Sequence, residues 1–183
     1  GRVKTVAYLD HNATAPVKPD VAEAVRKALG TCGNPSSVHG AGRAARRMVE
    51  DGRDAVAALA GARPERVVFT ACGTEANNLA LRGTGRTRVL AGATEHPSVL
   101  KGAEDIVIIP VQRDGRLDLA ALDAMLAKDS APALVSVMLA NNETGVIHPV
   151  AEAAQVAKRH GALIHCDASQ APGRIAFDMA SLG

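Results

Sequence analysis

The sequence is poor in aromatic side chains: phenylalanine, tyrosine and tryptophan make up 2% of the 183 residues, and tryptophan is absent. A planar cofactor would therefore find few aromatic rings to stack on, and histidine is a natural substitute. The 3 cysteines are widely spaced and form no C-x-x-C pair, which fits neither a disulfide framework nor a zinc site. We therefore expect no metal site and a reducing compartment, the cytoplasm.

Long hydrophobic runs are also missing. No apolar stretch approaches the roughly 18 residues of a membrane span, and the first residues show no signal-peptide pattern. The net charge is only +2, which indicates no polyanionic partner. Arg43, Arg46 and Arg47 form a small basic group, but no aromatic residues are interleaved and acidic residues follow. We expect neither a membrane partner nor a nucleic-acid partner.

The same basic segment contains a G-x-G-x-x-A pattern at Gly40, Gly42 and Ala45. A dinucleotide-binding fingerprint requires an apolar strand directly before such a pattern. No strand is predicted there, so the pattern does not predict a nucleotide site.

What the sequence does contain is an alternation of two kinds of segment. Short apolar, β-branched runs predict strands at residues 66–70, 88–93, 105–111, 133–140 and 162–167. Apolar residues at helical spacing predict helices at residues 19–29, 37–60, 74–82, 119–127 and 150–160. The predicted fold class is α/β, a three-layer αβα arrangement with a mainly parallel sheet.

Ligands of such sheets bind beyond the carboxyl ends of the strands. Four of the five predicted strand ends carry compact polar clusters. Their sequences are TACGTEANN (70–78), ATEHPSV (93–99), LANNETG (139–145) and HCDASQ (165–170).

The first cluster places Gly73 and Thr74 at the start of a predicted helix. Free backbone N–H groups, a hydroxyl and the helix dipole suit a phosphate there. The alternative is that Thr74 only caps the helix, with Asn77 on the second turn.

The two middle clusters offer a histidine and an amide. His96 could lie flat over a planar ring and transfer protons, because its pKa is normally near neutrality; the alternative is an ordinary loop histidine. Asn142 could reach a phenolic or carbonyl oxygen, whereas the alternative is turn chemistry, common for Asn–Asn and Thr–Gly.

A purely structural role explains the last cluster least well, because Asp167 is a charged residue at the end of a predicted buried strand. Its carboxylate could cap a helix or pair with Arg174. It could also hold a protonated ring nitrogen, as an aspartate does for pyridoxal phosphate (PLP). Gln170 would then lie near another polar edge of the ring. Four clusters along one edge favour the joint interpretation, a PLP site.

Six motifs together resemble the cysteine desulfurases, which are class V aminotransferase-like PLP enzymes of fold-type I. The sequences NNETG (141–145) and HCDASQ (165–170) are similar to those of the nitrogen-fixation and housekeeping iron–sulfur group. The motifs are LDHNATAP (9–16), GNPSSVHGAG (33–42), FTACGTEANN (69–78), TEHPSV (94–99), NNETG (141–145) and HCDASQAPGRI (165–175).

The resemblance implies roles for individual residues. Gly73 and Thr74 would bind the phosphate, and His96 would stack on the ring and act in catalysis. Asn142 and Gln170 would contact the phenolic oxygen, and Asp167, also catalytic, would pair with the ring nitrogen. Cys72 departs from the family pattern, where a glycine or another small residue is common.

The resemblance also implies an organisation and an activity. Residues 1–183 would comprise an N-terminal arm and most of the PLP-binding large domain of a homodimeric enzyme. The enzyme would convert L-cysteine to L-alanine and pass the sulfur to an iron–sulfur scaffold or other sulfur acceptor protein.

The family's Schiff-base lysine and nucleophilic cysteine fall in motifs that this sequence does not contain. Lys101, Lys128 and Lys158 lie on helical patterns, and the three cysteines have other surroundings. The 183-residue chain is therefore expected to be an inactive fragment. Alternatives are another class V PLP enzyme, such as a selenocysteine lyase or an aminotransferase, and a non-catalytic chain that binds a partner.

Overall fold

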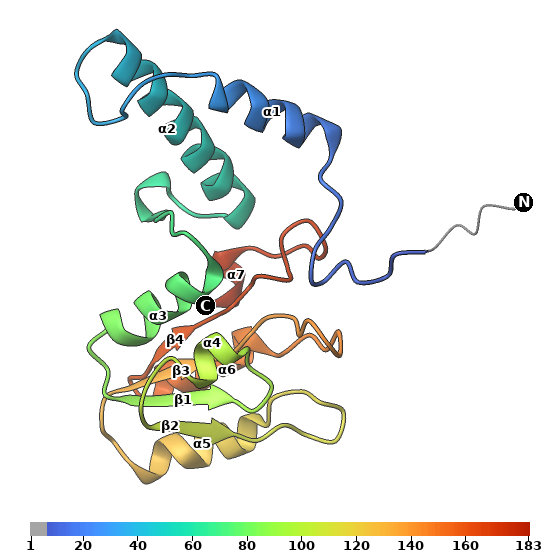
Figure 1. Ribbon diagram of the computed structural model, residues 1–183. Coiled ribbons are helices and arrows are strands. Elements are labelled where there is room, and N and C mark those ends of the chain that lie inside the picture. The colour runs from blue at the N-terminus through green and yellow to red at the C-terminus, as the bar shows by residue number, and fades with distance from the viewer. Residues whose placement is uncertain (1–6) are drawn as a thin grey trace, which may run out of the picture. The chain divides into compact units, whose positions relative to one another are not determined.

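The computed structural model describes residues 7–183, and the chain divides into two compact units (Figure 1). The first unit runs to Ala58 and includes Arg63–Val67; the second consists of Leu59–Ala62 and Val68–Gly183. The first unit contains the helix α1 (Pro19–Leu29), nearly all of α2 (Gly40–Ala60), and the 3-10 helix η1 (Pro64–Arg66). Both predicted helices of this unit are confirmed.

The second unit is built on a four-stranded sheet with the strand order β2-β1-β3-β4, in which every pairing is parallel. The strands are β1 (Arg88–Gly92), β2 (Ile106–Ile109), β3 (Ala133–Ser136) and β4 (Leu163–His165). Four of the predicted strands are confirmed, with shorter bounds.

Helices cover both faces of this sheet. They are α3 (Gly73–Gly83), α4 (Pro97–Leu100), α5 (Leu119–Lys128), α6 (Val150–Arg159) and α7 (Met179–Leu182). Side chains alternate along β1: Leu90 packs in a core cluster with residues of α5 and α6, whereas Val89 and Ala91 pack with Leu81 of α3 and Val99 of α4. The predicted three-layer αβα class is confirmed.

The predicted strand at residues 66–70 is wrong. Arg66 ends the 3-10 helix η1, and the residues after it form no strand within the described part of the chain. Val68 and Phe69 are 69% and 51% exposed. The segment has β-branched residues, but pairing with a neighbour is what makes a strand, and sequence propensity does not supply one.

Pairing between β3 and β4 continues past their assigned ends. Val137 N–H donates to the His165 carbonyl at 3.0 Å, and Leu139 N–H donates to the Asp167 carbonyl at 2.9 Å. These bonds hold the backbone of Asp167 against the chain that leads into the 139–145 turn. The end of the sheet therefore positions two of the predicted clusters directly.

Candidate functional site

The N-terminus of α3 lies next to the segment after β4. The helix begins at Gly73, where a Cβ atom would lie 3.7 Å from Ser169 Oγ. Cys72 is the N-cap residue, its side chain makes no capping bond, and its φ of −164° is unstrained. The first N–H groups of a helix have no partner within it and suit an anion. The alternative that Thr74 caps the helix is wrong.

Asp167 is half-buried and accepts hydrogen bonds on both carboxylate oxygens. Oδ1 accepts from Ser169 N at 2.9 Å and from Ser169 Oγ at 2.6 Å, and Oδ2 accepts from Asn77 Nδ2 at 2.9 Å. Burial alone raises the pKa of Asp167, but the bonds from Ser169 and Asn77 outweigh it, so the pKa lies below its usual value. The carboxylate is therefore ionised at neutral pH, with these two residues as its partners.

Asn77 connects Asp167 to His96. The same Nδ2 atom that bonds Asp167 also donates to Ser98 Oγ at 2.9 Å. Ser98 Oγ lies 2.7 Å from His96 Nδ1, which also accepts from Ser98 N at 3.1 Å. Because Nδ1 is an acceptor, a neutral His96 carries its proton on Nε2. Sequence reasoning missed the roles of Asn77 and Ser98, although both lie inside the motifs.

His96 and Asn142 line the same hollow, which has a volume of about 330 Å³. His96 is exposed and is the N-cap residue of α4. In the turn before Asn142, Asn141 Nδ2 donates to the Thr94 carbonyl at 3.0 Å, and Asn141 Oδ1 accepts from the backbone of Glu143 at 2.9 Å. Asn141 thereby fixes the turn that presents Asn142 beside His96.

A buried histidine connects the turn that contains Thr94 to Leu117. His148 is 4% exposed; its Nδ1 accepts from Leu117 N, and its Nε2 lies near Thr94 Oγ1, each at 3.2 Å. Burial lowers the pKa of His148. A neutral ring with its proton on Nε2 satisfies both contacts, so His148 acts as a structural tie.

Thr74 and Gln170 are placed beside this network through their backbone positions. Thr74 is the residue after Gly73 in α3, and its carbonyl accepts from Asn78 Nδ2 at 2.8 Å. Gln170 directly follows Ser169, and its Oε1 atom is buried. The structure thus brings three of the predicted site residues together: Gly73, Asp167 and His96. The side chains that connect them are those of Asn77, Ser98 and Ser169. Asn142 lines the same hollow as His96.

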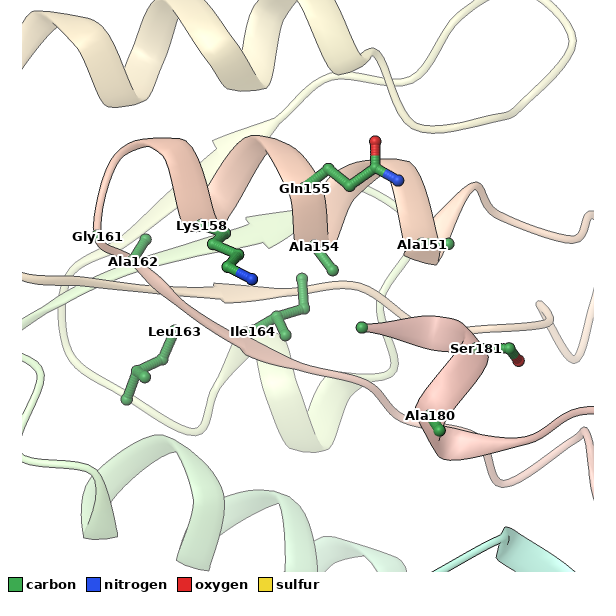
Figure 2. Close-up of a pocket in the computed structure, with 11 residues that line it drawn as sticks. Ala151, Ala154, Gln155, Lys158, Gly161, Ala162, Leu163, Ile164, Ala180 and Ser181 are labelled. Atoms are coloured by element: carbon green, nitrogen blue, oxygen red, sulfur yellow. The ribbon is translucent and has the colours of Figure 1, made fainter.

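The two cysteines of the second unit lie directly beside candidate site residues, whereas Lys158 lies away from them. Burial, together with the negative charges of Glu95 and Asp167, raises the pKa of Cys166 to about 12, so it stays a thiol. Cys72 is exposed. Lys158 lines a pocket of about 600 Å³ between α6, β4 and α7 (Figure 2). That pocket contains no predicted site residue and is separate from the cluster around Asp167.

In residues 7–183, no group of three or more His, Cys, Asp and Glu side chains is placed to hold a metal ion. None of the helices described there combines the length and apolar character that a membrane crossing requires.

Comparisons with known proteins agree with one another. The class-V aminotransferase family matches residues 7–183. An IscS-like cysteine desulfurase of Mycobacterium tuberculosis is 40% identical over 195 residues, covering 97% of this chain and 50% of the relative. A NifS-like protein from Rickettsia africae has a similar structure, with a TM-score of 0.91 and 35% identity over 96% of this chain and 51% of that one.

A third relative was solved with a small molecule. The protein SspA in complex with cysteine has a TM-score of 0.87 and 26% identity, over 97% of this chain and 55% of that one. The chain therefore spans about half the length of the relatives it matches.

Proposed function

The chain belongs to the class V aminotransferase family, and from this premise we propose that it forms the PLP-binding part of a cysteine desulfurase. The observation that carries the proposal is the bridge from Asp167 through Asn77 and Ser98 to His96. It joins an ionised carboxylate and an exposed imidazole beside the start of a helix.

The residues present fit PLP. An ionised, half-buried carboxylate such as Asp167 favours a protonated ring nitrogen, because opposite charges in a partly dry site stabilise each other. Asn77 is four residues after Gly73, so the carboxylate lies about one helical turn from the N-terminus of α3. Free N–H groups at Gly73 and Thr74 would hold a phosphate.

The other predicted residues would orient the ring. His96 would lie on its face, with the imidazole held by Ser98 at Nδ1 and the protonated Nε2 left to exchange a proton. Asn142 and Gln170 would contact the phenolic oxygen. PLP, when bound, supplies an electron-accepting ring, and Asp167 would keep that ring in its cationic, more strongly accepting form.

The whole enzyme would act on L-cysteine, yielding L-alanine and a sulfur atom for iron–sulfur cluster assembly. The names of the relatives support this substrate, as does SspA, which was solved with cysteine. The expected assembly is a cytoplasmic homodimer that delivers sulfur to a scaffold or other acceptor protein.

The 183-residue chain would bind the cofactor without turning over cysteine. Lys101 lies at the end of α4, Lys128 at the end of α5, and Lys158 beside the separate pocket of Figure 2. Cys166 stays protonated at neutral pH. Incubation of the purified chain with PLP and L-cysteine should therefore release no alanine or sulfide, and measurable release would contradict this part of the proposal.

A PLP titration tests the cofactor site. Saturable binding, measured by equilibrium dialysis and cofactor absorbance, should weaken at least about tenfold in Asp167→Ala, since an ion pair is lost. Asp114→Ala is the matched control, because Asp114 is a surface carboxylate paired with Arg116. A folded chain without saturable binding, or equal weakening in both variants, would overturn the proposal.

A further inference from the structure

Glu95 is a buried carboxylate directly before His96, and the proposed function gives it no role. Its side chain is 5% exposed. Oε1 accepts from the backbone N–H of Met138, and Oε2 lies 3.4 Å from Ser136 Oγ. A buried carboxylate is costly unless specific donors stabilise it, so its position needs an explanation.

The position of the Met138 N–H group explains why a carboxylate is buried here. Alternate N–H groups of a strand point to opposite neighbours. Those of Val137 and Leu139 point to the β4 side, where they bond the carbonyls of His165 and Asp167. The N–H of Met138 therefore points to the β1 side of the sheet.

On that side, the chain after β1 has already turned away. The last residue of β1 is Gly92, whose carbonyl accepts from Glu95 N at 3.1 Å in a turn. No backbone carbonyl of a continuing strand is then available to Met138. The carboxylate of Glu95 takes the place of that missing bond in the β-ladder.

Gly92 lies beside the Glu95 carboxylate. A Cβ atom there would lie 3.6 Å from Glu95 Oε1 and 3.2 Å from Leu117 Cδ1. The 3.6 Å separation is an ordinary van der Waals contact, so the Glu95 carboxylate folds back close to Gly92, and only Leu117 would be crowded by a side chain there.

We propose that Glu95 is a positioning residue for the candidate site: its carboxylate replaces a β-ladder bond to Met138 and thereby fixes the turn that carries His96. The inference rests on the proposed function only in taking that site as the place where PLP binds.

The charge state of Glu95 suits this role. Burial and, to a smaller extent, the negative charge of Asp167 together raise the pKa of Glu95 to about 7, although the hydrogen bonds from Met138 and Ser136 lower it. A protonated Glu95 still accepts from Met138 through its carbonyl oxygen and can donate to Ser136 instead of accepting from it. Ser136 Oγ is also 2.9 Å from His165 Nδ1, so either direction of hydrogen bonding can be satisfied.

The groups that face Glu95 come from several segments. Asp167 and Cys166 lie after β4 and interact with it electrostatically, and His165 reaches it through Ser136. On its own turn, His96 follows it in the chain, and His148 contacts the preceding residue, Thr94.

Glu95→Gln is the informative variant, because a glutamine reproduces the shape and hydrogen bonding of the protonated form. Its amide oxygen accepts from Met138 and its NH₂ group donates to Ser136. Glu95→Ala removes both contacts. Glu104→Ala is the control, because Glu104 is an exposed glutamate of the same unit.

Amide hydrogen exchange at Met138, measured by NMR on the purified chain, tests the ladder bond. Glu95→Gln and Glu104→Ala should keep protection within about threefold of wild type, whereas Glu95→Ala should lose at least about tenfold and shift the ¹⁵N signals of the His96 ring. Wild-type protection in a folded Glu95→Ala chain would overturn the inference.

A second measurement decides the case if Glu95→Ala does not fold. The amide signal of Met138 should titrate with a midpoint near 7 in wild type, and this step should be absent in Glu95→Gln. The same step in both chains would assign the titration to another group and overturn the inference.

A PLP titration separates this inference from the proposed function. Glu95→Gln should bind PLP within about threefold of wild type, and Glu95→Ala about tenfold more weakly. Absence of binding by wild type would overturn the proposed function, while exchange at Met138 would still decide the role of Glu95.

Discussion

The side-chain amide of Asn77 donates to Asp167 Oδ2 at 2.9 Å, although the two residues are 90 positions apart in the sequence. Because Asn77 Nδ2 also bonds Ser98 Oγ, one nitrogen atom joins α3, α4 and the segment after β4. A neutral amide is well suited here, since it stabilises the charge of Asp167 without cancelling it. The ionised carboxylate is left with a net charge to offer a cationic ligand.

Removing this bridge should weaken both the fold and the site. Asn77→Ala leaves a half-buried carboxylate with one hydrogen-bonding residue fewer, so we expect a loss of about 1–3 kcal/mol in the free energy of unfolding. The pKa of Asp167 should rise, because the bond from Asn77 is among the contacts that lower it. Urea denaturation and a carboxyl ¹³C titration measure the two effects.

Asn78→Ala is the matched control for that variant. Asn78 is the next residue of the same helix, but its amide bonds the carbonyl of Thr74 on the helix itself. Its loss should cost less than about 0.5 kcal/mol and leave the pKa of Asp167 unchanged. Equal effects of the two substitutions would show that helix propensity, not the bridge, explains the result.

The strands and helices around this bridge could be predicted from local sequence, but the bridge itself could not. Periodicity and β-branched residues locate β1 and β3 because those segments are buried on both faces. The contact between Asn77 and Asp167 depends on strand order and register, which residues far apart determine together. Asn77 therefore looked like a helical residue of the second turn until the fold was known.

In the candidate site, too, some residues could be predicted from local sequence and others could not. The positions of Asp167 and His96 follow from the rule that ligands bind beyond strand ends. The supporting residues Glu95, Asn141 and His148 have no such rule, because each acts through a contact that no motif spacing encodes. The segment 66–70 shows the opposite error: its β-branched residues predicted a strand, but no strand forms there among the described residues.

The ionised state of Asp167 predicts how stability depends on acid. Its pKa is lowered in the folded chain, so the unfolded chain binds the proton more readily. Its contribution is complete above the unfolded pKa, about 3.9, and is lost as the pH falls through the folded value. The free energy of unfolding of wild type minus that of Asp167→Asn should therefore decrease as the pH is lowered through this range.

Urea denaturation at a series of pH values measures this difference. Surface carboxylates such as Asp114 and Asp123 also have lowered pKa values, but they are present in both chains and cancel. A difference that stays constant from about pH 6 to pH 3 would contradict the assignment of a lowered pKa to Asp167.

Two glycines of α2 should respond oppositely to the same substitution. A Cβ atom at Gly42 would lie 2.6 Å from Ser37 Cβ and 2.8 Å from the Asn34 carbonyl oxygen, whereas at Gly52 nothing lies within 4 Å. Gly42→Ala should destabilise the first unit by roughly 1–3 kcal/mol, and Gly52→Ala should stabilise it by about 0.5–1 kcal/mol.

Loss of helical circular dichroism in urea measures both variants. Gly42 belongs to the G-x-G-x-x-A pattern of the sequence, and its contacts give that glycine a packing reason that needs no nucleotide. Stabilisation by Gly42→Ala would show that the 34–37 loop moves away from the helix at little cost.

The buried His148 should make stability fall on mild acidification. Because burial lowers its pKa, the unfolded chain takes up the proton first, so its stabilising contribution is complete above about pH 6.5 and is lost below it. His148→Leu leaves the N–H of Leu117 without its acceptor and should cost about 1–3 kcal/mol at neutral pH. The difference from wild type should shrink between about pH 7.5 and pH 5.5.

The lowered pKa of His165 does not confuse this test, because His165 is present in both chains and cancels in the difference. Thr94→Val gives a second check, since it removes the hydroxyl near His148 Nε2 but keeps the bond from Leu117. Its cost should be about 1 kcal/mol alone and close to zero in the His148→Leu background, because the two residues share one contact. Additive losses in this cycle would mean that His148 does not hold the turn through Thr94.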